Sequence, residues 1–358
     1  MRVLALTRYD RLGASSRIRI YQYLPTLCPL GVEVDVSPLL GADYIQRLYA
    51  RQRPSFPRML SGYFFRAVRL LSARRYDLLW IEKELFPNVP CWFEQALAAA
   101  GIPYVVDIDD AIFHNYDLGS NPYKRFLANK IEKVMRGSAL MVCGNDYLAE
   151  RARLAGASRV ETLPTVIDME RYSVAPIRTR TPPVVGWVGS PVTLRYLVSV
   201  LPVLREARRA FPFRLRVIGA DLPSTLVEGL DIECRPWSED AEVQEIQDLD
   251  IGIMPLTDSP WERGKCGYKL IQYMACGLPV VASPVGVNQE IVTHGVNGYL
   301  ADTPEAWGTA LRTLCLDPGL AREMGTKGRA TVEQRYCLQV TAPRLAGWFQ
   351  DVVRQRRP

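Results

Sequence analysis

Two glycine-containing junctions in this sequence have the residue types that hold an anion. They are Leu12–Arg17 and Gly189–Thr193, and each follows the first short apolar run of one half of the chain. Small residues at such a junction let backbone N–H groups approach an anion at the start of a helix. A tight turn needs the same residues. Because the junctions take equivalent positions in the two halves, we expect Gly13 and Gly189 to lie beside a bound phosphate, with Ser190 next to the second.

A short acidic segment is the second place where chemistry could occur. Asp107, Asp109 and Asp110 are close neighbours, and His114 follows them. His and Asp side chains commonly donate and accept protons in enzymes. The Asp-x-Asp spacing also matches a metal-binding motif, but such a pair arises easily in a chain with 38 acidic residues, and we expect no metal. A turn or a helix cap is the structural alternative for this segment.

The elements that must position these residues follow a regular alternation. Short apolar runs rich in Val, Ile and Leu alternate with longer amphipathic stretches, a pattern typical of a parallel, doubly wound sheet. The predicted strands of the first half are Arg2–Thr7, Val32–Ser37, Asp77–Ile81, Tyr104–Ile108, Ala139–Cys143 and Val160–Leu163. Those of the second half are Val184–Val188, Arg214–Ile218, Ile232–Arg235, Ile251–Met254 and Pro279–Ala282. Helices predicted between them include Arg17–Leu27, Asn88–Ala100, Tyr123–Arg136, Thr193–Arg209, Lys269–Cys276 and Leu320–Tyr336.

The alternation stops once, at Ser173–Pro183. This stretch has no apolar period and contains Ala-Pro and Pro-Pro, which is typical of a linker. The sequence therefore predicts an α/β chain of two Rossmann-like domains, residues 1–175 and 183–340. A C-terminal helix at residues 341–358 could pack on the first domain. Ligands of such sheets bind at the carboxyl ends of the strands, and two domains can enclose a cleft.

The composition argues against several classes of protein. Of 358 residues, 48% are hydrophobic and 23% are charged, as in a globular chain. No apolar run approaches the roughly 18 residues that cross a bilayer, and residues 1–13 do not resemble a signal peptide, so we expect a cytoplasmic protein. Eight cysteines without a C-x-x-C pair, with only two histidines, argue against a zinc site. The P-loop, the G-x-G-x-x-G fingerprint and the G-x-S-x-G elbow are absent from the sequence.

Positive charge is concentrated in the first half of the chain. The net charge is +6, and residues 44–76 contain eight arginines, several aromatic residues and no Asp or Glu. Met59–Leu71 has an amphipathic, basic helical pattern that could lie on an anionic membrane surface. A solvated basic helix packed on the sheet is the structural alternative. A site for single-stranded nucleic acid is the least favoured interpretation, and we expect no nucleic-acid partner.

The most informative stretch is Gly264–Gly298. It contains Q-Y-M-A-C-G-L-P-V-V-A-S, then P-V-G-V-N-Q-E-I-V and H-G-V-N-G-Y-L. These blocks resemble the motifs E-A-M-A-x-G-x-P-V-V-A-[ST], G-G-x-x-E-x-[IV] and G-x-N-G of the retaining glycosyltransferase family four (group 1). Leu163–Asp168 resembles the family's P-N-G-[VI]-D. The resemblance implies the GT-B fold, in which two Rossmann-like domains face a central cleft, with a nucleotide sugar on the second domain and the acceptor on the first.

The sequence departs from the family's pattern at several site positions. The family's two glutamates, eight residues apart, correspond to Gly264 and Gln272, and Gln272 could still bind a ribose hydroxyl. The family's Arg and Lys after the first strand of the second domain correspond to Ser190 and Arg195, so only one charge is kept. We expect nearby lysines to replace the other, because cations can stabilise a departing diphosphate without a metal.

The candidate site combines these positions. Asp109 or Asp110 could orient the acceptor hydroxyl or stabilise positive charge on the sugar, and Trp237 could stack on the base or simply close the core. The expected catalytic residues are Asp109, Asp110, His114 and Lys269. The expected donor-binding residues are Gly13, Arg17, Gly189, Ser190, Arg195, Trp237, Lys265, Lys269, Gln272 and Glu290.

The resemblance implies a retaining, metal-independent glycosyltransferase without a separate cofactor. It would move a sugar from a UDP- or GDP-sugar to a hydroxyl of a glycan, a lipid-linked saccharide or a secondary metabolite, in the cytoplasm or at the inner face of the membrane. A nucleotide-sugar epimerase on the same fold is one alternative, although two histidines are few for its acid/base chemistry. A catalytically inactive binding or scaffold protein is the other, because the glutamate pair is missing.

Overall fold

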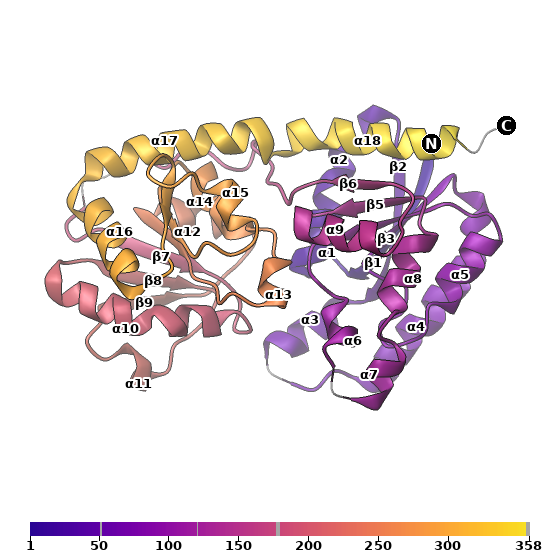
Figure 1. Cartoon of the computed structure of the whole chain (residues 1–358), viewed down its shortest axis with the longest axis horizontal. Helices are drawn as coiled ribbons and strands as arrows, with labels where there is room; N and C mark the ends of the chain where they lie inside the picture. Colours follow the sequence, from indigo (N-terminus) through magenta and orange to yellow (C-terminus); the bar gives the residue numbers. More distant parts are fainter. Residues whose placement is uncertain (51, 120, 177–179, 356–358) are drawn as a thin grey trace. The chain divides into compact units, whose positions relative to one another are not determined.

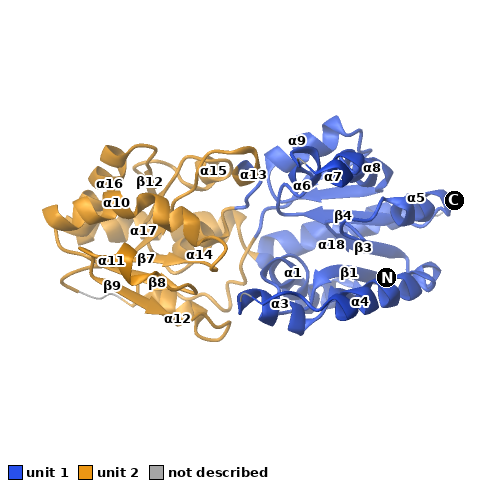
Figure 2. Ribbon diagram, turned by 90° about the horizontal axis from the view of Figure 1, so that it is seen from below, with its two compact units in different colours: residues 1–165, 263–266, 338–358 blue, residues 166–262, 267–337 orange. Residues whose placement is uncertain are grey.

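The computed structural model describes residues 1–50, 52–119, 121–176 and 180–355. The chain forms two compact units (Figure 2). Unit 1 contains residues 1–165, 263–266 and 338–358, and unit 2 contains residues 166–262 and 267–337. Each unit is built on a six-stranded parallel sheet with helices packed against it, so the doubly wound α/β class predicted from the sequence is confirmed.

The sheet of unit 1 reverses its strand order beside its first strand. Across the sheet the strands are β2 (Glu33–Leu40), β1 (Arg2–Tyr9), β3 (Leu78–Glu82), β4 (Tyr104–Ile108), β5 (Leu140–Cys143) and β6 (Val160–Thr162) (Figure 1). Val3 pairs with Val34 of β2 on one side and with Leu78 of β3 on the other. Strands β3, β4 and β5 are buried throughout, as expected for central parallel strands of largely apolar sequence. The reversal lies between β1 and β3, where sheets of this kind bind ligands.

The helices of unit 1 are mostly short. Pro25 interrupts the single helix expected at Arg17–Leu27, because proline has no N–H and clashes with the preceding turn. The helices are α1 (Ala14–Arg19), η1 (Tyr21–Tyr23), α2 (Leu24–Leu27), η2 (Cys28–Leu30), α3 (Ala42–Tyr49), α4 (Phe56–Leu70), η3 (Ala73–Arg75), α5 (Trp92–Ala99), α6 (His114–Asp117), α7 (Pro122–Phe126), α8 (Lys130–Gly137), α9 (Asp146–Leu154) and α18 (Leu338–Arg354).

The C-terminal helix α18 belongs to unit 1. The ring centroid of its Phe349 lies 5.1 Å from that of Trp80 in β3, and both side chains are fully buried. The hydroxyls of Thr341 and Tyr23 share a hydrogen bond of 3.0 Å. The segment thus supplies core side chains to a unit that begins at the other end of the chain. Residues 356–358 of the predicted helix lie outside the described residues.

The sheet of unit 2 repeats this plan. Across the sheet the strands are β12 (Gly298–Leu300), β11 (Val280–Ala282), β10 (Ile251–Met254), β7 (Val184–Val188), β8 (Arg214–Ile218) and β9 (Ile232–Arg235). Its reversal lies between β7 and β10. The helices are α10 (Leu194–Ala210), α11 (Ser224–Val227), α12 (Glu242–Gln247), α13 (Pro260–Arg263), α14 (Tyr268–Ala275), α15 (Asn288–Ile291), α16 (Pro304–Leu316) and α17 (Pro318–Arg335).

The stretch predicted as a linker, residues 173–183, lies inside unit 2 where it is described. The N–H of Ala175 donates a hydrogen bond of 2.8 Å to the carbonyl of Cys276, and Tyr172 just before it is buried. These tertiary contacts attach the start of the stretch to the unit. Residues 177–179 lie outside the described residues.

Within the described part of the chain, none of the helices combines the length and the hydrophobicity that a membrane crossing requires.

Helix α17 packs tightly on the turn after α14. A Cβ at Gly325 would overlap the carbonyl group of Gly277, whereas a Cβ at Gly308 in α16 would meet no atom within 4 Å. Gly325→Ala is therefore expected to lower the free energy of unfolding by about 1–3 kcal/mol through overpacking. Gly308→Ala, the matched control, is expected to raise it by about 0.5–1 kcal/mol because alanine favours the helix. Urea unfolding of both variants measures the difference, and equal effects would contradict the close packing.

Candidate functional site

The carboxyl edge of the unit 2 sheet opens where β7 and β10 part. These strands pair only at Val185 and Gly186 of β7. Beyond that point the Tyr273 hydroxyl accepts a hydrogen bond of 2.8 Å from the N–H of Val188, and it donates one of 3.4 Å to the carbonyl of Ile253. The tyrosine thus satisfies backbone groups that the separating strands leave unpaired. A crevice at such a reversal is the usual ligand position of a doubly wound sheet.

The Gly189 junction lies at this opening, among side chains that sequence analysis had considered separately. Gly219, at the end of β8, has a φ of +90°, and a Cβ there would clash with the carbonyl oxygen of Gly189 and press on Trp237. Glycine is required because the two backbone segments come so close. Gly189, Gly219 and Trp237 therefore meet at the carboxyl ends of β7 to β9.

The turn that leads from β7 into α10 is held by its own side chains. The N–H of Ser190 donates to the Thr193 hydroxyl at 3.1 Å, and that hydroxyl donates to the Ser190 carbonyl at 3.0 Å. Helix α10 then runs for 17 residues. Its N-terminus carries the positive end of the helix dipole. Anion binding at this junction stays a prediction.

The Trp187 side chain contacts both Lys269 and the Gly189 junction. The Nζ atom of Lys269 is 5.7 Å from the centroid of the Trp187 ring. The same ring fills the space that a Cβ of Gly189 would need. A cation on an indole face keeps its charge while its alkyl stem packs. Lys269 and Gly189, both predicted to bind the donor, are therefore brought together by a residue of β7 that the sequence analysis did not single out.

Arg195, the second predicted phosphate contact, has an acidic partner. Its guanidinium lies 3.1 Å from Glu262 and 2.7 Å from the Tyr196 hydroxyl. Burial raises the pKa of Glu262, but hydrogen bonds from Ser259 and Tyr196 and the charge of Arg195 outweigh it, so the pKa is lowered. The carboxylate is charged at neutral pH and offsets the charge of Arg195. A contact of Arg195 with a diphosphate stays a prediction.

Gln272 and Glu290 occupy different surroundings. Gln272 is buried, and its side-chain nitrogen donates to the Tyr172 hydroxyl at 2.8 Å and also to Glu242. Those two bonds use the whole donor capacity of the amide. Glu290 is exposed on the short helix α15, which packs against Gly267 at the start of α14. A ribose contact by either residue stays a prediction.

The first junction, in unit 1, already holds an anion that belongs to the chain. The carboxylate of Glu82, at the end of β3, accepts hydrogen bonds from the hydroxyls of Ser15 (3.0 Å) and Ser16 (2.6 Å) and from the N–H of Arg8 (2.8 Å). Glu82 is buried. The polar groups of this junction are therefore engaged internally. Phosphate binding beside Gly13 stays a prediction, and this geometry argues against it.

Lys83 organises the acidic segment of unit 1. It is buried, has a φ of +65°, and its Nζ lies 2.9 Å from Asp109 and 3.2 Å from Asp110. Burial raises the pKa of Asp109, but Lys83, Arg19 and the Ser15 hydroxyl together lower it below its usual value. Asp109 is therefore a charged, fixed group. A non-glycine residue with positive φ is uncommon and is held by such contacts.

Asp110 is the more exposed of the two carboxylates. Its side chain is 31% exposed, against 14% for Asp109, and it lies 4.0 Å from the Nζ of Lys265. Lys265 belongs to the loop 263–266 that is part of unit 1, where its carbonyl accepts a hydrogen bond of 2.9 Å from the Asn145 amide. The structure thus groups Lys265 with the acidic segment. Asp110 is the carboxylate better placed to meet an incoming hydroxyl.

Three further predicted or neighbouring residues are tied into unit 1. Both ring nitrogens of His114 are engaged, with Asp117 at 2.9 Å and the Tyr147 hydroxyl at 2.8 Å. Arg17 is buried on α1. The buried Arg19 donates a hydrogen bond of 2.7 Å to Asp107, and the two side chains are only 1% exposed. His114 as a proton donor and Arg17 as a donor contact stay predictions.

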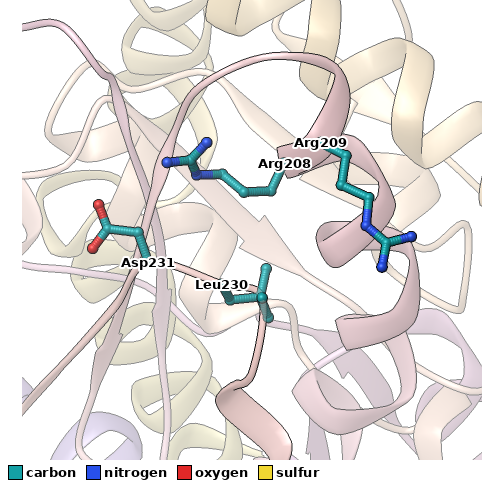
Figure 3. A pocket seen from close by; sticks show the side chains of 5 residues that line it. Arg208, Arg209, Leu230 and Asp231 are labelled. Carbon is teal, nitrogen blue, oxygen red and sulfur yellow. The ribbon is translucent and has the colours of Figure 1, made fainter.

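A separate depression of 450 Å³ lies elsewhere on unit 2 (Figure 3). Its walls include Arg208 and Arg209, at the end of α10, and Leu230 and Asp231, just before β9. In Figure 3 Arg208 extends toward Asp231. Because the strands are parallel, the start of β9 lies at the amino edge of the sheet. The depression is therefore at the edge opposite Gly189.

Across the described ranges 1–50, 52–119, 121–176 and 180–355, no group of three or more His, Cys, Asp or Glu side chains could hold a metal ion.

Several residues of these two clusters were missed by the sequence analysis. They are Ser15, Glu82, Lys83, Trp187, Gly219 and Glu262. Glu82 and Lys83 follow the strand predicted at Asp77–Ile81, so their position at a strand end was a signal. Gly219 follows the strand predicted at Arg214–Ile218 in the same way. Nothing local in the sequence indicates that Glu262 would pair with Arg195, 67 positions away.

Known proteins share both the sequence of unit 2 and the fold. A family model described as "Glycosyl transferases group 1" matches residues 182–317. N-acetyl-alpha-D-glucosaminyl L-malate synthase of Bacillus anthracis is 30% identical over 95 residues, which are 26% of this chain and 25% of that relative. The part of the chain that matches, residues 182–317, is therefore similar to the group 1 glycosyltransferases. The chain spans about a quarter of the length of this curated relative.

Solved structures resemble this chain over nearly its whole length. Sucrose-phosphate synthase from Thermosynechococcus elongatus has a TM-score of 0.76 and 15% identity, and the match covers 99% of this chain and all of the other. Anabaena Alr3699/HepE in complex with UDP-glucose has a TM-score of 0.72 and 17% identity, with 98% and 99% covered. At such identities the likeness establishes the fold alone. The predicted GT-B fold of two doubly wound domains is confirmed.

Proposed function

We propose that the protein is a retaining, metal-independent glycosyltransferase that moves a sugar from a nucleotide sugar to a hydroxyl acceptor. The observation that carries the proposal is the cluster at the carboxyl edge of unit 2. There Gly189, Trp187 and Lys269 meet at the start of a 17-residue helix. This cluster lies within the residues that match the glycosyltransferase family model. It provides a cation and a helix N-terminus for one anionic group.

The chemistry of the leaving group explains why these parts are suited to sugar transfer. Cleavage of the bond to the sugar leaves negative charge on the diphosphate. Positioned N–H groups and a cation stabilise that charge more in the transition state than in the bound substrate. Lys269 and the Gly189–Thr193 junction would supply both. Retention of configuration is expected from the resemblance of Gly264–Gly298 to the retaining family.

The donor is proposed to be a UDP-sugar, with a GDP-sugar as the second candidate. The support is the likeness in fold to the Anabaena protein, which was solved in complex with UDP-glucose. Trp237 beside Gly219 offers an aromatic face for the base. No cofactor other than the nucleotide sugar is proposed.

The acceptor is proposed to be a hydroxyl of a glycan, a lipid-linked saccharide or a secondary metabolite that binds unit 1. Asp110 would orient that hydroxyl, because its carboxylate is partly exposed and its neighbours are fixed. Asp109 would act by holding Lys83 and Ser15 in place. An exposed carboxylate with ordered partners is the feature of unit 1 that supports an acceptor site.

A thermal-shift comparison of nucleotides tests the donor. UDP or UDP-sugar at a hundred times its dissociation constant is expected to stabilise the protein by about 2.7 kcal/mol, because it binds the folded state only. ADP serves as the matched control for the base, and a shift with GDP in place of UDP would indicate the second candidate. No shift with UDP, GDP or their sugars would refute a nucleotide-sugar enzyme. Release of UDP with transfer of a labelled sugar would distinguish a transferase from a scaffold protein, and a change of sugar configuration without transfer would identify an epimerase.

A further inference from the structure

Helix α4 presents an apolar outer face that is exposed among the described residues of the chain. Phe56, Leu60, Phe64, Phe65 and Leu71 are each between 61% and 85% exposed. A spacing of four residues places most of these side chains along one side of a helix. Soluble proteins rarely expose such a continuous line of large apolar side chains unless it binds something.

The opposite face of α4 is fixed firmly to the sheet. A Cβ at Gly62 would overlap the carbonyl oxygen of Leu39, so only glycine lets the helix approach β2 this closely. The buried Arg66 donates hydrogen bonds to the carbonyls of Thr7 (2.5 Å) and Ser37 (2.9 Å). The Tyr63 hydroxyl donates to the carbonyl of Pro87 at 2.8 Å. The helix therefore cannot turn its apolar face inward without breaking these contacts.

Aromatic contacts connect the sheet-facing side of α4 to the start of α5. The ring of Tyr63 lies 5.5 Å from Phe86, and Phe86 lies 4.5 Å from Phe93 at the start of α5. The neighbouring Trp92 is 64% exposed. Tryptophan is enriched where a protein meets the interface between lipid and water. The surface formed by the outer face of α4 together with Trp92 is called the α4 surface below.

The charges around the α4 surface are positive. No Asp or Glu occurs from residue 44 to residue 76, and Arg53, Arg74 and Arg75 are exposed before and after the helix. Asp43 is shared by Arg47 and Arg58, and Asp35 is shared by Arg2 and Arg69. Two arginines on each carboxylate leave an excess of positive charge. An apolar face bordered by arginines is complementary to a surface with an anionic outer layer and an apolar layer beneath it.

We infer that the α4 surface docks unit 1 on an anionic lipid bilayer. The outer phenylalanines would insert at the level of the acyl boundary while the arginines contact headgroup phosphates. The helix would lie in the plane of the interface, held by the sheet behind it. The inference rests on the proposed function in one respect: docking would bring unit 1 to a membrane-borne acceptor. It extends the basic-helix expectation from the sequence by naming the apolar side chains that insert.

Vesicle flotation tests the inference with the full-length protein. Wild type is expected to float with vesicles of phosphatidylcholine and phosphatidylglycerol, and to float less in high salt or with phosphatidylcholine alone. Phe64→Gln with Phe65→Gln is expected to weaken binding at least about tenfold, since two large apolar side chains lose their burial. Arg74→Gln with Arg75→Gln is expected to weaken it about fivefold per arginine, and only with anionic vesicles.

Matched controls come from exposed residues elsewhere. Leu154→Gln with Leu316→Gln removes exposed apolar side chains, and Arg312→Gln with Arg322→Gln removes exposed charges, without touching the α4 surface. Both control pairs are expected to float like wild type. Flotation that is absent in wild type, or lowered equally by the control pairs, would overturn the inference.

Two other partners give distinct results in the same set of variants. Wild type could instead bind a single-stranded oligonucleotide, or self-associate in sedimentation, and lose that property in the Phe64/Phe65 variant. Either result, with no vesicle binding by wild type or variant, would also overturn the inference. A nucleotide thermal shift in the Phe64/Phe65 variant separates this inference from the proposed function, because the shift is expected to be unchanged whether or not the variant floats.

Discussion

Lys269→Ala is expected to lower kcat by about 100- to 1000-fold, the usual cost of removing one preorganised group that stabilises developing negative charge. The lysine lies over Trp187, beside the Gly189 junction. Arg195, the other predicted cation of unit 2, is already paired with Glu262. The measurement is initial-rate transfer of labelled sugar at saturating donor. KM for the donor is expected to change less than kcat, because the charge is greatest in the transition state.

Two further substitutions show whether the effect is specific. Lys269→Arg keeps the positive charge and is expected to retain much of the activity, while Lys327→Ala removes an exposed lysine of α17 in the same unit and is expected to leave it unchanged. Comparable rates for Lys269→Ala and wild type would remove Lys269 from the proposed mechanism. An equal loss in Lys269→Arg would show that the site requires the lysine's shape as well as its charge.

Arg19→Met is expected to lower the free energy of unfolding by about 3–5 kcal/mol at neutral to alkaline pH, because it leaves a buried carboxylate without its partner. Arg19 and Asp107 join α1 to the end of β4, and each is only 1% exposed. The double variant Arg19→Met with Asp107→Leu removes both charges and is expected to recover most of the loss. Urea unfolding of the two variants and wild type provides the measurement. A double variant no more stable than Arg19→Met would contradict the explanation.

The loss in Arg19→Met is also expected to depend on pH. Burial raises the pKa of Asp107 to about 6, although Arg19 lowers it. A carboxyl whose pKa is higher in the folded state stabilises folding below its unfolded pKa, and this contribution is lost as pH rises through the folded pKa. Without Arg19 the folded pKa rises further, so the carboxyl stays neutral over a wider range. The free energy of unfolding of Arg19→Met should therefore approach that of wild type in mildly acidic buffer. It should fall furthest below the wild-type value in alkaline buffer.

Much of the fold follows from local sequence patterns. Four of the five strands predicted in the second half have the observed bounds. Two of them, β7 and β10, are short, fully buried runs without a charged residue, as expected for central parallel strands. The strand β12 was not predicted, because three residues at the sheet edge make no such run. The single helix predicted at Tyr123–Arg136 is divided into α7, which ends at Phe126, and α8, which begins at Lys130. The attachment of Ala175 to Cys276 is a tertiary contact, and no local sequence pattern predicts it.

Sequence patterns indicate where candidate site residues lie in the fold, but not which side chains contact one another there. The structure brings together Gly189 and Lys269, which were predicted separately as donor contacts. The glycine-containing junction at Gly13 predicted a phosphate where the structure has the carboxylate of Glu82. Local sequence shows that a junction can hold an anion, but not which anion the fold brings there. Only the packing of β3 beside β1 determines that.

The return of α18 to unit 1 makes unit 2 an insertion within unit 1 along the chain. Residues 338–354 complete a core begun by residues 1–165, as Phe349 on Trp80 shows. A chimaera that exchanges donor specificity between relatives should therefore replace an internal block, residues 166–337, and keep both flanks from one parent. Within that block the loop 263–266 should come from the parent of the flanks, because Asn145 binds its backbone. The segment to exchange is thus internal to the chain and does not extend to the C-terminus.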